Sequence, residues 1–309
     1  MEGTRDAYGK ALAQLGHEDP RIVVLTADLA GSTKTAQFAA EHPDRFFNMG
    51  VAEANMIGTA AGLAMSGYRP FVSTFAVFAT GKVWEQVRQV VAYPNVAVRI
   101  AATHAGLTVG EDGASHQMLE DVSNMRVLPN MRVVVPADSV EAAAVTRWAA
   151  SNDDGPIYLR MARAPFPVIH DEGFAFELGK AERLTEGSDV TIVACGIMVS
   201  VALEAQERLS ATGISAEVIN VSSIKPLDVE AIIASAAKTG AVVTAEEHQI
   251  TGGLGSAVCE ILSEQQPTRV VRVGVDDRFG QSGAAEDLLS HYGLDVDGVV
   301  AAAHQVLSS

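Results

Sequence analysis

FFNMGVAEANMIGTAAGLAMSGYRPFVSTF, residues 46–75, combines a strand end, a helix and a second strand. The aromatic pair Phe46–Phe47 suits the end of a strand, Gly50 interrupts it, and the small apolar run from Ala54 to Ala64 predicts a tightly packed helix. The run RPFVSTF at 69–75 predicts the next strand. Parallel strands need such a crossover helix between them, so this stretch indicates an α/β protein.

The predicted helix in this stretch has two unusual features. Gly58 and Gly62 each cost about 1 kcal/mol relative to alanine in a helix interior, which predicts that the backbone packs closely against another element. Glu53 is the only acidic or basic side chain between Arg45 and Arg69. A carboxyl group with apolar neighbours is shifted toward its protonated form, as acid–base catalysis requires. A glutamate in a first helical turn also complements the helix dipole, so a structural role stays open.

Predicted strands and helices alternate along the chain in two series. In the first, strands are expected at 21–29, 69–75, 95–103, 131–136 and 156–162, and helices at 5–15, 33–40, 81–93, 121–128 and 139–151, the last capped by Ser139. In the second, strands are expected at 189–196, 215–221, 240–248 and 268–275, and helices at 199–211, 228–237, 254–264 and from 295. Proline, glycine and charge between the series predict a linker at 166–187. We therefore expect two domains, 1–165 and 188–309, each a mostly parallel sheet covered by helices.

The composition limits the classes of function. A formal charge of −16 argues against nucleic acid and anionic membrane surfaces as partners. Cys195 and Cys259 stand far apart without metal-ligand spacing, which fits ordinary thiols in a reducing compartment. No run approaches the roughly 20 apolar residues of a membrane span, and the first residues show no apolar signal region. These features predict a cytoplasmic protein.

Polar and aromatic residues recur where the predicted strands end, and such ends form one rim of a parallel sheet. The loop THAGLTVGEDGASHQ at 103–117 carries His104, Glu111, Asp112 and His116, which could bind hydroxyl groups and transfer protons. The histidine spacing matches no common metal motif, so no metal site is predicted. A polar surface loop with ordinary turn residues is the alternative.

Two further pairs lie at the same rim. Phe75 and Phe78 would form a flat apolar face beside the helix of Glu53, or simply part of the core. Arg160 and Arg163 end a predicted strand, where a planar guanidinium suits phosphate or sulfonate. A surface ion pair in an acidic protein is the alternative for the arginines.

Together these motifs resemble transketolase, and the resemblance covers nearly the whole chain. THAGLTVGEDGASHQ resembles the substrate loop of that family, NMGVAEANMIG the stretch with its catalytic glutamate, STFAVF its aromatic clamp, and TADLAGS its TADL-x-x-S turn. The chain looks like the C-terminal subunit of a split bacterial transketolase, with the pyrimidine-binding and C-terminal domains.

The resemblance implies a role at thiamine diphosphate for several residues. Glu53 would hydrogen-bond a ring nitrogen of the pyrimidine and so activate the cofactor. Phe75 and Phe78 would wall the pyrimidine, and Asp28 would lie near it. The clamp of the family has a third aromatic residue, a tyrosine, where this chain has Gly81.

The resemblance also implies a substrate site. Ser32, His104 and Arg163 match positions that bind the sugar phosphate, and Asp112 matches one that reads a substrate hydroxyl. His116 matches the position beside the transferred two-carbon unit. Arg160 has no clear counterpart but is kept as a substrate-binding candidate. The predicted catalytic residues are Glu53, His104 and His116.

One motif of the family is missing from the sequence. GDG, which holds the diphosphate and magnesium ion together with a later asparagine, does not occur. The resemblance therefore implies that an N-terminal, diphosphate-binding subunit supplies the Mg²⁺ ligands. The implied assembly is a heterotetramer of two pairs, in which the glycine-containing helix meets its symmetry mate.

The expected activity is transfer of a two-carbon ketol unit from a phosphorylated or otherwise anionic ketose to an aldose, as in pentose phosphate metabolism. A 1-deoxyxylulose-5-phosphate synthase and a β subunit of a 2-oxoacid dehydrogenase share the fold and are alternatives. The synthase loop usually lacks the Thr-His pair seen at 103–104, and the β subunits lack the histidine loop. A non-catalytic scaffold or regulatory partner with this fold is a further alternative.

Overall fold

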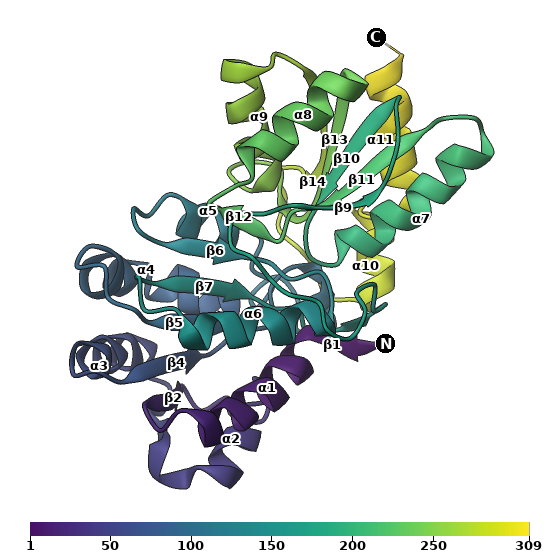
Figure 1. Ribbon diagram of the computed structural model, residues 1–309. Helices are drawn as coiled ribbons and strands as arrows, with labels where there is room; N and C mark the ends of the chain where they lie inside the picture. The colour runs from purple at the N-terminus through teal and green to yellow at the C-terminus, as the bar shows by residue number, and fades with distance from the viewer. Residues whose placement is uncertain (309) are drawn as a thin grey trace.

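The computed structural model describes residues 1–308 and contains two α/β units, which lie one above the other in Figure 1. The lower unit includes the N-terminus and is built on a seven-stranded sheet in the order β12-β6-β7-β5-β4-β2-β3. The upper unit is built on a five-stranded sheet in the order β14-β13-β10-β11-β9. The predicted fold of two mostly parallel sheets covered by helices is therefore confirmed.

The first sheet is parallel except at β12, which runs antiparallel to β6. Its strands are β2 (Ile22–Thr26), β3 (Phe46–Asn48), β4 (Arg69–Ser73), β5 (Arg99–Ala102), β6 (Arg132–Val134), β7 (Ile157–Arg160) and β12 (Ser223–Lys225). Its helices are α1 (Thr4–Glu18), α2 (Ala36–Glu41), α3 (Glu53–Met65), α4 (Trp84–Gln86), α5 (Asp121–Arg126) and α6 (Ser139–Ser151). The short strands β1 (Glu2–Gly3) and β8 (Pro165–Phe166) pair with each other and join the two ends of this unit.

The second sheet is parallel except at β9, which runs antiparallel to β11. Its strands are β9 (Glu182–Thr185), β10 (Val190–Ala194), β11 (Ala216–Asn220), β13 (Ala241–Gln249) and β14 (Arg269–Val275). Its helices are α7 (Met198–Ala211), α8 (Val229–Thr239), α9 (Leu254–Gln265), α10 (Ala285–His291) and α11 (Val296–Leu307).

Both faces of the first sheet are buried, which explains the continuous apolar runs of its strands. Consecutive residues of β4 show this: Phe71 packs with Tyr8 of α1, whereas Val72 packs with Ile57 of α3. Side chains alternate between the two faces along each strand, so both faces contribute to the core. The loops that follow the carboxyl ends of β2, β4 and β5 are therefore the positions available for a site.

The segment predicted as a linker, 166–187, is more ordered than its composition indicates. It contains β9, an edge strand of the second sheet. In the other direction, β12 comes from the second half of the chain and extends the first sheet. The two units are therefore interlocked through β12, and neither β9 nor β12 was predicted.

Three local expectations need correction. The helix predicted at 81–93 begins earlier, with wide π-helical turns at Val77–Lys82 and Val87–Ala92 on either side of α4. The cap of α6 is Asp138 rather than Ser139, since the Asp138 carboxylate accepts from the Glu141 amide. Alanine side chains at positions 58 and 62 of α3 would meet nothing within 4 Å, so these glycines pack against no other element of residues 1–308.

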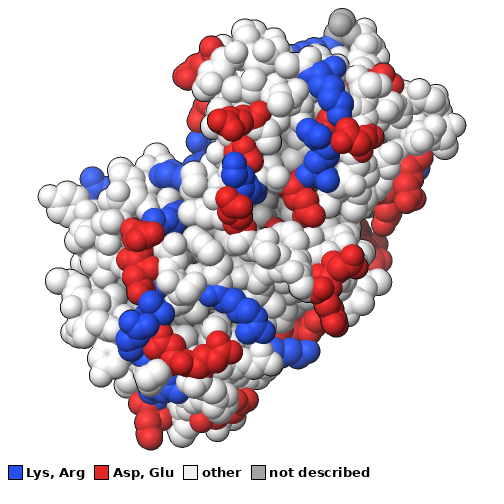
Figure 2. Space-filling model, viewed as in Figure 1, with Lys and Arg blue, Asp and Glu red and all other residues white. Residues whose placement is uncertain are grey.

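Two further observations concern the charge on the surface and the length of the helices. Basic and acidic side chains are interspersed on the face shown in Figure 2, which carries no continuous basic patch. Within residues 1–308, no helix has both the length and the apolar character that crossing a membrane requires.

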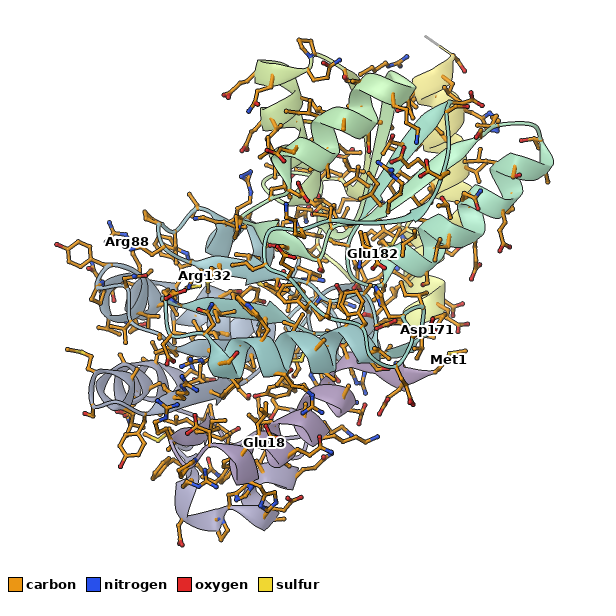
Figure 3. All side chains as sticks on the ribbon, in the orientation of Figure 1. Met1, Glu18, Arg88, Arg132, Asp171 and Glu182 are labelled. Atoms are coloured by element: carbon orange, nitrogen blue, oxygen red, sulfur yellow. The ribbon has the colours of Figure 1, made fainter. Side chains whose placement is uncertain are left out.

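His170 links the first unit to the second sheet. Its Nδ1 lies 2.9 Å from Asp138 and its Nε2 lies 2.8 Å from Glu182, which is labelled where the two units meet in Figure 3. Burial by itself lowers the pKa of His170, but the hydrogen bond to Asp138 and the charge of Glu141 outweigh it and raise the pKa to about 9. His170 is therefore protonated at neutral pH and bridges two carboxylates.

The raised pKa predicts that the stabilisation from His170 is complete below pH 6.5 and disappears as the pH rises through about 9. We expect the free energy of unfolding of the native chain to fall by roughly 2–3 kcal/mol across this window relative to His170→Gln. Urea denaturation at several pH values measures this difference. His304→Gln, at an exposed position on α11, is the control, and parallel curves for the native chain and His170→Gln would contradict the prediction.

Candidate active site

Four predicted site residues form one aromatic cluster at the carboxyl ends of β4 and β5. A bridge between Phe75 and Thr103 continues the pairing of the two strands and brings their following loops together. His104 stacks on Phe75 with ring centroids 3.8 Å apart, and Phe78 stacks on the same ring at 5.9 Å. His116 meets both phenylalanines edge-on. The expectation that residues after the carboxyl ends of parallel strands meet at one rim therefore placed these side chains correctly beside one another.

The backbone and ring of His104 are held in a defined state. The residue has a left-handed φ of 58°, which costs energy in a non-glycine residue and is found mainly at functional sites. Nδ1 lies 2.8 Å from the Thr103 hydroxyl, and Nε2 lies 3.3 Å from Nη1 of Arg5. Because a guanidinium can only donate, Nε2 is the acceptor and the ring proton belongs on Nδ1.

The environment of His104 keeps its ring neutral. Burial lowers the pKa of His104 to about 3, with further lowering from the positive charges of Arg5 and Arg163. We therefore expect ¹⁵N NMR of the imidazole to show a neutral Nδ1–H tautomer down to pH 5. Arg5→Gln is expected to raise the pKa because one of the lowering charges is removed. Titration of His104 near 6.5, the value of a histidine in water, would contradict this prediction.

Arg5 and Arg163 make this part of an acidic protein locally basic. Nη1 of Arg5 also donates to the Ser32 carbonyl at 2.9 Å, so Arg5 joins two residues predicted for the anionic end of a substrate. Nη1 of Arg163 donates to the Val109 carbonyl and contacts Glu111 at 2.9 Å. Arg5 was missed in the sequence because no local motif marks it; only the contact between the start of α1 and the loop after β5 shows its place.

Asp28 lies at a tight turn after β2, with a left-handed φ of 61°. The Asn48 amide nitrogen donates to the Asp28 carboxylate at 3.0 Å, while its oxygen accepts from the amides of Asp28 and Gly50. Asn48 therefore ties the Asp28 turn to the turn that leads into α3 and Glu53. Asn48 is a second residue that was not predicted from the sequence, although it lies at the carboxyl end of β3, where such residues are expected.

Glu53 is buried at the first turn of α3, with 2% of its surface exposed. The expectation that it lacks a charged neighbour is wrong, because Lys82 Nζ donates to its carboxylate at 2.6 Å. The helix after β4 brings Lys82 there from 29 positions further along the chain. Lys82 also lies 6.0 Å from the Phe78 ring centroid, which places the ion pair beside the aromatic cluster.

The remaining predicted residues are placed differently. Asp112 is exposed at the end of the 3₁₀ segment Leu107–Asp112. Arg160 is not available as a substrate ligand, since it is 6% exposed and fully engaged inside the protein. Its Nε donates to Asp121 at 2.7 Å and its Nη2 donates to the Glu247 carbonyl at 2.8 Å. Arg160 therefore joins the two units.

The residues present fit one half of a thiamine diphosphate site. A pyrimidine ring needs an aromatic wall and a hydrogen-bonding carboxyl group, and the half-buried Phe78 beside Glu53 provides both. Among residues 1–308, the only cluster with metal-ligand geometry is His17, Glu41 and His42, which belongs to α1 and the region of α2. Both ring nitrogens of His42 are already bonded, to the Ala13 carbonyl and to Arg45, so this cluster offers no complete magnesium site.

The fold and this rim fit the class of α/β proteins that use thiamine diphosphate. The family model for the transketolase pyrimidine-binding domain matches residues 2–167, and that for the transketolase C-terminal domain matches residues 179–299. The chain therefore belongs to the transketolase family, whose members use thiamine diphosphate.

Three similar proteins match this chain over nearly its whole length. A "Putative transketolase C-terminal section" of Methanocaldococcus jannaschii is 50% identical, over 96% of this chain and 94% of that protein. A 6-deoxy-6-sulfo-D-fructose transketolase subunit of a Clostridium species is 46% identical, over 98% and 94%. A solved split-gene transketolase, described as an inactive β4 tetramer, is 53% identical with a TM-score of 0.94, covering 100% of this chain and 99% of that one.

Proposed function

We propose that the chain is the pyrimidine-binding subunit of a two-subunit transketolase, which transfers a two-carbon ketol unit from an anionic ketose to an aldose. The observation that carries this proposal is the single rim on which Glu53, Phe78, His104 and His116 meet. A scaffold that had only kept the fold would have no chemical need for this arrangement.

When bound, thiamine diphosphate supplies the nucleophilic carbon that accepts the two-carbon unit. In this chain, the Glu53 side chain would hydrogen-bond the pyrimidine ring and Phe78 would shield one side of it from water. The neutral ring of His104 accepts from Arg5 and so fixes the guanidinium that faces the substrate. His116, whose ring borders both phenylalanines, contacts the reacting hydroxyl groups.

Arg5, Arg163 and Ser32 support an anionic group at the far end of the sugar. A planar guanidinium binds phosphate and sulfonate oxygens alike. Related proteins act on both kinds of sugar by their names, a 6-deoxy-6-sulfo-D-fructose transketolase subunit and an apulose-4-phosphate transketolase subunit. Pentose phosphates, sulfo-sugars and apulose phosphate are therefore the donors to test first.

Arg5→Gln is expected to raise KM for an anionic ketose donor about 10–100-fold, because a charge-assisted hydrogen bond is worth roughly 1.5–3 kcal/mol. Transfer from the same ketose without its anionic group should change less than about threefold. Steady-state kinetics with both donors measures the difference. Arg208→Gln, at an exposed site on α7, is the matched control, and equal effects on both donors would contradict the anion site.

A second chain is required by this proposal, because the sequence contains no GDG motif for the diphosphate. We propose a heterotetramer of two such pairs, with the exposed Gly58 and Gly62 of α3 facing a neighbouring subunit. The partner would supply the magnesium ligands. The cytoplasmic location predicted from the sequence stays part of the proposal.

Co-purification from the source cells tests the assembly. The expected result is a companion chain that carries GDG, with near-stoichiometric thiamine diphosphate in the complex. A lone chain without cofactor would overturn the proposal and favour the scaffold.

An alternative activity is that of a 1-deoxyxylulose-5-phosphate synthase, since one from Geobacter sulfurreducens is also a relative. The Thr103–His104 hydrogen bond at the anion site favours transketolase, because that pair is the part of the loop the synthase usually lacks. Decarboxylation of a 2-oxoacid by the complex, without ketol transfer, would favour this alternative or the 2-oxoacid dehydrogenase type.

A further inference from the structure

Glu247 is a buried carboxylate that the second unit sends into the loop between His104 and His116. It lies on β13 and is 2% exposed. Its Oε1 accepts from the backbone amide of Thr108 at 2.6 Å. The loop lies in the first unit. This hydrogen bond therefore connects the segment that carries the predicted catalytic residues His104 and His116 to the C-terminal domain.

The loop backbone comes unusually close to this carboxylate. Gly106 has a left-handed φ of 84°, and a Cβ atom at this position would overlap the carboxylate of Glu247. Only glycine satisfies both conditions. The start of the loop is fixed on its other side, where the Gly106 amide donates to the Met118 carbonyl at 2.9 Å. Glu247 and Met118 therefore hold the segment directly after His104 from two directions.

The second unit also holds the other end of the loop. The side-chain Nε2 of Gln117 donates to the Gln281 carbonyl at 2.9 Å and to the Leu107 carbonyl at 3.1 Å. Gln117 follows His116 directly, so the position of His116 depends on this contact. The second unit thus contacts the loop at Thr108, after His104, and at the Gln117 side chain, after His116.

The charges around Glu247 are arranged to keep its carboxylate in position. Arg160 on β7 lies 3.9 Å from Oε2 and donates to the Glu247 carbonyl, while Asp121 on α5 binds the opposite side of Arg160. Within residues 1–308, Oε2 has no hydrogen-bond partner. Arg160 is thus held by Asp121 and Glu247, while Oε2 of Glu247 accepts no hydrogen bond within that part of the chain. This arrangement indicates that the orientation of the Glu247 carboxylate is used rather than its charge.

We propose that Glu247 is a positioning residue, which sets the conformation of the loop from His104 to His116 through the Thr108 amide. The C-terminal domain then takes part in the active site through the loop that carries both histidines. The kinetic part of this inference rests on the proposed transketolase function, whereas the structural part does not.

Hydrogen exchange of the full chain without cofactor tests the structural part. We expect the Thr108 amide to exchange at least tenfold faster in Glu247→Ala, and in Glu247→Asp, which keeps the charge but is one methylene shorter. Glu247→Gln keeps an acceptor oxygen and should show the native rate. Amides of β10 should be unchanged in Glu247→Asp and Glu247→Gln, which shows that the second sheet is folded. Native exchange at Thr108 in Glu247→Asp would overturn the proposal.

Kinetics of the complex test the functional part. We expect kcat/KM for ketol transfer to fall about 10–100-fold in Glu247→Asp, because a displacement of about 1 Å at a reacting group can cost that much. Glu247→Gln should restore it to within about threefold. Glu246→Gln is the control, since that neighbouring carboxylate binds the amides of Leu254 and Gly255 and not the loop. Faster exchange with unchanged kinetics in an active complex would overturn the positioning role, while an inactive native complex would instead count against the proposed function.

Discussion

Glu53→Gln is expected to lower the turnover of ketol transfer by about 10³-fold while the complex stays assembled. A positioned acid–base group contributes roughly 10²–10⁴-fold, and glutamine has the same shape but cannot exchange a proton at neutral pH. The side chain is buried and its neighbour Lys82 can still donate to the amide oxygen, so the local packing is preserved. The loss should therefore appear in kcat rather than in KM for the sugars.

Native mass spectrometry and steady-state kinetics on the same preparation measure this effect. Glu85→Gln, an exposed acid on α4 close to Lys82 in the sequence, is the control and should retain native turnover. Unchanged turnover in an intact Glu53→Gln complex would remove Glu53 from the mechanism and favour a non-catalytic role for the chain.

Most of the fold was predictable because its strands are buried on both faces. Such strands are continuous apolar runs, and β2, β5 and β10 stand out for that reason. The edge strands β9 and β12 are short and have exposed or polar positions, so they carry no comparable pattern. The pairing of β12 also depends on how the two halves of the chain meet, which local sequence does not encode.

The candidate site divides in the same way. Phe75 and His104 follow strand ends, and the topology of a parallel sheet is enough to bring them together, whereas His116 reaches them through the long loop after β5. Arg5 and Lys82 reach the site across long sequence separations from helical segments, and no periodic pattern marks such contacts. The sequence therefore predicted the aromatic rim and Arg163, and it missed Arg5 and Lys82.

Arg160 shows why a position at the rim is not sufficient evidence for a role. It ends β7, as expected, but its side chain pairs with Asp121 of α5, which is completely buried, and reaches the Glu247 carbonyl of the second unit. Asp121 also accepts from the Tyr158 hydroxyl at 2.6 Å. The structure thus assigns Arg160 and Asp121 to a buried ion pair at the junction of the two units.

Asp121→Ala is accordingly expected to lower the free energy of unfolding by about 3–5 kcal/mol, because it leaves the charge of Arg160 buried without its closest partner. Urea denaturation measures the loss. Asp297→Ala, which removes an exposed partner of Arg208, should cost less than about 1 kcal/mol and is the control.

The double variant Asp121→Ala/Arg160→Met decides between the two roles of Arg160. Replacing both charges by apolar groups removes the uncompensated arginine charge but also takes the cation away from the buried Glu247, so part of the lost stability should return. In the assembled complex this variant should keep a native KM for an anionic ketose, because the substrate anion is expected at Arg5 and Arg163. An increase in KM of tenfold or more would restore Arg160 to the substrate site, where the sequence first placed it. A native KM with partly recovered stability would establish that the arginine holds the two units together and takes no part in binding the sugar.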